Sequence, residues 1–268
     1  MAPPSYDRSA GARGALVGAL AGGGADPLRE ALAEELAEGR TDLRLLAERW
    51  VARYRATPGA VDTETAAALE ILAAQGAPPT AGGRGGGALA RTVPVALVAF
   101  RAPRTLVSAT LHIAALTHPD PAAAWSAVAV NVALGVLLHG RRDVVPEVLE
   151  ALTGNRAPAE LIAAVRRVPV NRREALPSPA AVSGDAVAAA AFALGLLQHE
   201  PLAARGFDLL RAAGPTPAGA AAGALLGARA GDAAIPVAGL DPVSLISWRR
   251  LGDRLLQRVP APAGGSRS

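Results

Sequence analysis

The chain has 268 residues, of which 51% are hydrophobic and 3% aromatic, and its formal net charge is +4. This length and composition can bury one large core, and the scarcity of aromatic side chains favours close-packed helices of Ala, Leu and Val. The absence of cysteine excludes disulfides and thiolate metal sites and fits a cytoplasmic protein. We expect a single all-α domain over residues 1–268, with flexible tails at 1–10 and 260–268.

The basic residues are unusual in kind and in distribution. All 27 Lys and Arg positions are arginine, a composition typical of proteins encoded by GC-rich bacterial genomes. Pairs such as Arg141-Arg142 and Arg249-Arg250 are scattered and have no aromatic residues between them. They indicate solvated surfaces and not a nucleic-acid site.

Helical periodicity recurs along the chain, with capping residues at the helix starts and Gly or Pro at most junctions. The run Ala122 to Leu138 is the longest apolar one, and it falls short of the roughly 20 residues of a membrane span. We therefore expect it to be a buried helix, and we expect no membrane partner. The predicted helices cover residues 28–37, 43–54, 63–74, 88–100, 103–116, 121–138, 144–153, 159–168, 182–198, 202–213, 217–230 and 243–259.

Glycines mark two further features. Residues 76–87 are too rich in Gly and Pro for a helix, and they form either a flexible linker or a loop beside a cleft. Glycines 219, 223, 227 and 231 fall on one face of the helix over residues 217–230. Because each interior glycine costs about 1 kcal/mol relative to alanine, this stripe indicates the close approach of a neighbouring helix.

Four sequence blocks carry a family resemblance. Residues 61–69 resemble a short T-x-x-A-L helix that precedes a glycine loop. Residues 85–94 read GGGALARTVP and resemble G-N-G-A-L-M-R-x-x-P, and residues 116–121 resemble a T-H-x-x-P turn. Residues 227–236 match G-A-R-x-G-x-x-x-I-P. In this order and spacing, the blocks resemble the ADP-ribosylglycohydrolase family, which includes the dinitrogenase-reductase-activating glycohydrolases. The resemblance implies a compact orthogonal helical bundle.

The chain differs from this family at the positions of the family's metal ligands. The segment Ala213 to Ala218 replaces the family's G-G-D-T-D-T with prolines at positions 215 and 217, and Gly24 to Pro27 aligns with T-D-D-T. A glutamate-bearing segment that precedes T-D-D-T in the family is deleted. In the family these Thr, Asp and Glu residues hold paired magnesium ions, and proline offers no side-chain ligand. The comparison predicts that the magnesium site is lost, with no metal and no cofactor bound.

Few polar residues remain as candidates for chemistry. Asp26 and His118 are the candidate catalytic residues, although Asp26 also fits a helix cap and His118 a structural histidine. Arg91 is a candidate for binding a ligand phosphate or for a structural ion pair. Thr216 is a candidate ligand residue or the N-cap of the helix that begins at Pro217, and that helix start is a cap or an anion site. Gly86 and Gly87 are candidate ligand residues of the glycine loop.

Three functions follow as hypotheses. The first is a family member that has lost its hydrolase activity and binds an ADP-ribose-like nucleotide or a protein. The second is a metal-independent hydrolase or lyase that uses the same cleft, and it predicts that Asp26, Arg91 and His118 converge. The third is a structural or oligomer-forming protein.

Overall fold

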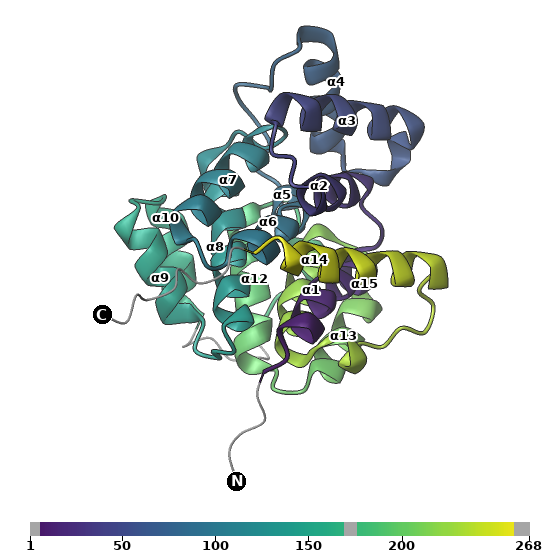
Figure 1. Ribbon diagram of the computed structural model, residues 1–268. Coiled ribbons are helices and arrows are strands. Elements are labelled where there is room, and N and C mark those ends of the chain that lie inside the picture. Colours follow the sequence, from purple (N-terminus) through teal and green to yellow (C-terminus); the bar gives the residue numbers. More distant parts are fainter. Residues whose placement is uncertain (1–5, 169–175, 260–268) are drawn as a thin grey trace, which may run out of the picture.

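In a computed structural model, which describes residues 6–168 and 176–259, the chain is helical and these ranges contain no strand (Figure 1). The predicted all-α class is confirmed, and the helices pack around one main apolar core as a single domain. The helices are α1 (Arg8–Gly23), α2 (Pro27–Ala37), α3 (Leu43–Ala56), α4 (Thr63–Gln75), α5 (Gly87–Arg91), α6 (Val93–Ala99), α7 (Pro103–Ala115), α8 (Pro121–Leu138), α9 (Val145–Gly154), α10 (Ala159–Arg167), α11 (Pro179–Val182), α12 (Ala186–His199), α13 (Ala203–Ala213), α14 (Pro217–Ala230) and α15 (Pro242–Gln257).

Side-chain caps set many of the helix starts. Asp42 accepts from two backbone N–H groups of α3, and Asp62 accepts from the backbone N–H of Thr65 in α4. Asp120 does the same for α8. A carboxylate at this position satisfies donors that have no partner inside the helix. For this reason local sequence places these starts correctly.

The sequence-based assignment was wrong at three places. The first helix, α1, was not predicted, and it begins at Arg8 with Asp7 as its cap, so residues 8–10 are helix and not tail. The expected helix 88–100 is interrupted at Thr92, between α5 and α6. The expected helix 182–198 begins only at Ala186, because Asp185 caps it after the separate turn α11. The expected tails at 1–5 and 260–268 lie outside the described residues.

The glycine stripe of α14 packs against α1, which carries glycines at the same spacing. Gly14 lies opposite Gly227, Gly18 opposite Gly223 and Gly22 opposite Gly219. A Cβ atom added to Gly18 would lie 2.8 Å from the carbonyl carbon of Gly223, closer than real Cβ contacts come. The backbones of the two antiparallel helices are therefore in contact. This contact explains why glycine occupies these positions despite its low helix propensity.

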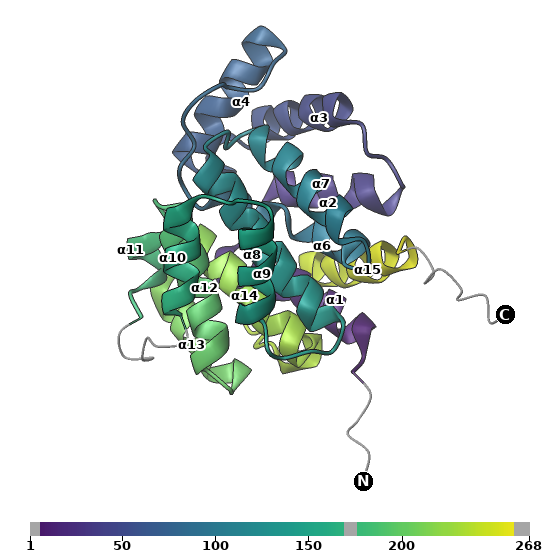
Figure 2. The same cartoon turned by 90° about the vertical axis from the view of Figure 1, so that its left-hand side faces the viewer.

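Helix α8 lies inside the bundle. It contacts α5, α6, α7, α9, α12 and α14, and Figure 2 shows it among these helices. Within the described ranges it is the one helix long and apolar enough to cross a membrane, and 83% of it is buried inside the protein. The prediction of a buried helix over this run is confirmed.

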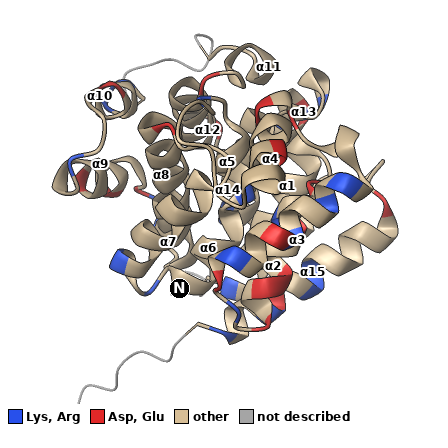
Figure 3. Ribbon diagram, turned by 90° about the horizontal axis from the view of Figure 1, so that it is seen from above, with Lys and Arg blue, Asp and Glu red and all other residues tan. Residues whose placement is uncertain are grey.

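Acidic and basic residues are interspersed along α2 and α3 (Figure 3). Arg49 pairs with Glu34 and Glu35, and Arg53 also pairs with Glu34 at 3.1 Å. Arg40 pairs with Glu35 at 2.5 Å. These arginines are neutralised by neighbours, so this face carries no continuous basic patch.

Candidate functional site

The glycine loop is held in place by hydrogen bonds from both sides. The backbone N–H of Gly85 donates to Oε2 of Glu64 at 2.7 Å, and the N–H of Gly86 donates to the carbonyl of Ser183 at 2.9 Å. The Arg84 carbonyl accepts from the N–H of Ala186 at 2.8 Å. Of the two interpretations of residues 76–87, the structure therefore favours an ordered loop packed between α4 and α12.

Arg91 in α5 lies at the centre of a buried polar group beside this loop. Its Nε is 3.4 Å from Oδ2 of Asp26, and its Nη2 is 3.7 Å from Oδ2 of Asp62. The guanidinium donates to Oγ1 of Thr65 and of Thr117, each at 3.1 Å. We call Asp26, Asp62, Thr65, Arg91, Thr117 and His118 the Arg91 cluster.

The charges of the cluster affect one another. Burial works to raise the pKa of Asp62, but the Arg91 charge and the hydrogen bonds from Thr65 outweigh it and hold this pKa below its ordinary value. Asp62 therefore carries its negative charge at neutral pH. Arg91 thus lies between two carboxylates that come from different segments of the chain.

His118 is buried and uncharged in this cluster. Burial, followed by the Arg91 charge, lowers its pKa to about 4, although Asp62 and Asp26 act in the opposite direction. Its Nδ1 is 2.9 Å from Oγ1 of Thr117, while its buried Nε2 has no hydrogen-bond partner and lies 4.0 Å from Oε2 of Glu64. A buried polar atom without a partner costs about 1–3 kcal/mol. A water or a ligand that reached Nε2 would remove this cost.

Gly87 packs directly against this nitrogen. A Cβ atom at Gly87 would lie 2.7 Å from Oδ2 of Asp62 and 3.0 Å from Nε2 of His118. A Cβ at Gly86 would lie 3.5 Å from Cβ of Pro217, at the start of α14. The two glycines thus connect the Arg91 cluster with the first turn of α14.

Comparison with known proteins identifies the family. A family model described as ADP-ribosylglycohydrolase matches residues 28–263. The chain belongs to the ADP-ribosylglycohydrolase family. Among solved structures, one described as an "ADP-ribosylglycohydrolase-related protein complex" is similar with a TM-score of 0.74 and 22% sequence identity, covering 94% of this chain and 99% of that chain. At this identity the likeness shows the fold. No curated protein matches the chain.

The fold brings together residues 22–26 and 215–216, from the two segments that the sequence analysis compared with metal-ligand motifs. The backbone N–H of Thr216 lies 3.4 Å from the carbonyl of Gly22, and a Cβ at Gly24 would lie 3.5 Å from Cβ of Pro215. The oxygen atoms here have partners within the chain. Oδ1 of Asp26 accepts from the N–H groups of Leu28 and Arg29, so its expected role as a cap is confirmed.

The start of α14 is also capped from within. Oγ1 of Thr216 accepts from the N–H of Gly219 at 2.9 Å, which confirms the expected N-cap. Oγ of Ser183 accepts from the N–H of Ala218 at 3.2 Å, and Pro217 has no N–H. Because these donors are engaged, the helix start has little left to offer an anion, and the expectation of an anion site here is weakened.

The sequence analysis missed two acidic residues of the site. Asp62 and Glu64 were not among the candidate site residues, yet Asp62 packs against Gly87 and Glu64 lies 4.0 Å from Nε2 of His118. Acidic residues at a helix start are common, so the spacing of Asp62 and Glu64 gave no signal of the contacts with Gly87 and His118. Within the described ranges, no group of three or more His, Asp or Glu residues is placed to hold a metal ion.

Proposed function

We propose that this ADP-ribosylglycohydrolase family member has lost the magnesium-dependent hydrolase activity and acts as a non-catalytic binding protein. The observation that carries the proposal concerns Asp26 and Thr216, the two residues with side-chain oxygens that remain in the altered motifs. Both oxygens already accept hydrogen bonds from the backbone. Asp26 caps α2 and faces Arg91, and Thr216 caps α14. Magnesium needs several convergent oxygens, and prolines 215 and 217 supply none.

The charge of Arg91 supports the same proposal. Its guanidinium lies 3.4 Å from Asp26 and already neutralises this carboxylate. A divalent cation at this place would have to displace a buried positive charge. The residues present therefore do not fit a pair of magnesium ions, and no catalytic step is derived through them.

The binding half of the proposal rests on the unpartnered nitrogen of His118. This buried Nε2 lies against Gly87, with Asp62 next to it, and a polar ligand would supply the hydrogen bond that it lacks. An ADP-ribose-like nucleotide, with many hydroxyl groups, fits this mixture of acceptors and donors. A cytoplasmic location is part of the proposal, since it is where such a nucleotide would be met.

Isothermal titration with ADP-ribose tests the proposal, in magnesium and in a chelator. We expect the same weak binding in both conditions and no release of ADP-ribose from ADP-ribosylated arginine. The variant Gly87→Ala should weaken binding at least tenfold, because its Cβ would lie only 3.0 Å from Nε2 of His118 and block the approach of a ligand. The control Gly154→Ala, where no atom lies within 4 Å of the added Cβ, should bind like the parent. Magnesium-dependent binding or hydrolysis would contradict the proposal.

A metal-independent hydrolase or lyase is the second candidate. The convergence of Asp26, Arg91 and His118 from three separate segments favours it. It predicts that the parent protein cleaves ADP-ribosylated arginine in the presence of a chelator, and that both Asp26→Asn and His118→Asn abolish this cleavage. If the folded parent protein shows no cleavage in chelator, this candidate is excluded.

A further inference from the structure

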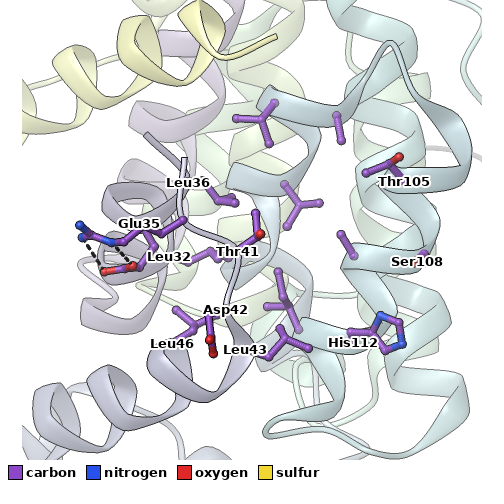
Figure 4. A pocket seen from close by; sticks show the side chains of 16 residues that line it. Leu32, Glu35, Leu36, Thr41, Asp42, Leu43, Leu46, Thr105, Ser108 and His112 are labelled. Carbon is purple, nitrogen blue, oxygen red and sulfur yellow. Dashed lines mark hydrogen bonds and ion pairs between the residues drawn. The ribbon is translucent and has the colours of Figure 1, made fainter. Parts of the chain in front are cut away.

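A cavity of about 250 Å³ lies at the opposite end of α2 from the Arg91 cluster (Figure 4). Its floor and walls are apolar and come from four helices, and none of its lining residues belongs to that cluster. The apolar lining consists of Leu32 and Leu36 from α2, Leu43 and Leu46 from α3, Val95, Val98 and Ala99 from α6, and Ala109 and Ile113 from α7.

The polar side chains that α7 contributes lie at the exposed rim of this cavity. Thr105, Ser108 and His112 follow one another in α7 at spacings of three and four residues, so they share one face of the helix. Figure 4 shows them along one side of the cavity, opposite Leu32 and Leu36. They supply hydroxyl and imidazole groups that can hydrogen-bond without a permanent charge.

The charged groups at the rim are already engaged within the protein. Glu35 pairs with Arg40 at 2.5 Å and also with Arg49. Asp42 accepts from the backbone N–H groups of Arg44 and Leu45 at 2.8 and 3.0 Å. A charged ligand would therefore lose its hydration without gaining a free counter-charge. A neutral ligand has no such penalty.

The volume limits the size of the ligand. A cavity of about 150 Å³ lined by apolar side chains binds benzene, so this one accommodates roughly ten non-hydrogen atoms. Apolar lining with a few convergent polar groups is typical of a small-molecule site. We propose that this cavity binds a small neutral ligand with a bicyclic or short aliphatic body and one hydroxyl or carbonyl group directed to the α7 rim.

The probe is 1-naphthol, a neutral bicyclic alcohol, titrated by its fluorescence and by isothermal calorimetry. We expect saturable one-to-one binding, and binding of the anion 1-naphthoate at least tenfold weaker. The variant Ala109→Phe, which fills the cavity from α7, should reduce 1-naphthol affinity at least tenfold. Ala191→Phe on α12 is the matched control, because Ala191 is also half-buried on a helix but does not line the cavity.

Several results would overturn the proposal. They are the absence of saturable 1-naphthol binding, equal binding of 1-naphthoate, and equal loss in Ala109→Phe and Ala191→Phe. A parent dimer that Ala109→Phe converts to a monomer would show that a second copy of the chain covers the cavity instead. Thermal melts establish folding first, and Val98→Phe, which fills the cavity from α6, replaces Ala109→Phe if the latter does not fold.

Discussion

The backbone contact between α1 and α14 gives a quantitative prediction for Gly18→Ala. An ordinary van der Waals contact begins at 3.4 Å, but the new Cβ would lie 2.8 Å from the carbonyl carbon of Gly223 and closer still to its oxygen. A helix backbone cannot rotate away as a side chain can. The two helices must move apart, and this also opens the neighbouring pairs at Gly14 and Gly22.

The magnitude follows from two opposing effects. Overpacking of a rigid core costs up to about 3 kcal/mol, and the better helix propensity of alanine returns about 1 kcal/mol. The net loss in the free energy of unfolding is therefore about 2 kcal/mol, which lowers Tm by roughly 4–8 °C in a protein of this size. Because one displacement makes room for both methyl groups, Gly18→Ala with Gly223→Ala should cost less than the sum of the single variants.

Calorimetry and urea unfolding of the purified variants measure these differences. The control Gly154→Ala adds the same methyl group to helix α9, where no atom lies within 4 Å, and it should leave Tm unchanged or raise it. If Gly18→Ala melts at or above the temperature of the parent protein, the close packing of α1 on α14 is refuted.

Three further predictions concern the site. Because the pKa of His118 is lowered to about 4, the unfolded chain binds this proton more readily than the folded chain, so stability should fall by about 2 kcal/mol between pH 7 and pH 5. In His118→Asn, the urea midpoint should therefore change much less between pH 7 and pH 5. If the variant loses as much stability as the parent, another group causes the loss. Thr216→Ala should lower stability by about 1 kcal/mol through the lost cap, whereas Thr216→Ser should restore it; equal midpoints for all three proteins would contradict the cap. Arg91→Met should cost about 2 kcal/mol at pH 7, because it leaves the partly buried carboxylates of Asp26 and Asp62 without their cation, and the loss should shrink in acid as Asp62 protonates. An Arg91→Met protein as stable as the parent would show that these pairs contribute nothing.

The site was only partly predictable from the sequence. Asp26, Arg91 and His118 were chosen from separate motifs, and the structure brings them into one cluster. Asp62 and Glu64 were missed, because their contact with His118 depends on how α4 packs against the glycine loop. No local spacing encodes that packing.

The all-α class and most helix starts can be predicted from local sequence. Asp42, Asp120 and Thr216 each satisfy donors within three residues, so the information is local. The helix that meets the glycine stripe of α14 and the residues that surround Arg91 become known only from the assembled fold. The partners of Gly223 and Arg91 lie far away along the chain, at Gly18 and Asp26, and such contacts form only when the whole core is assembled.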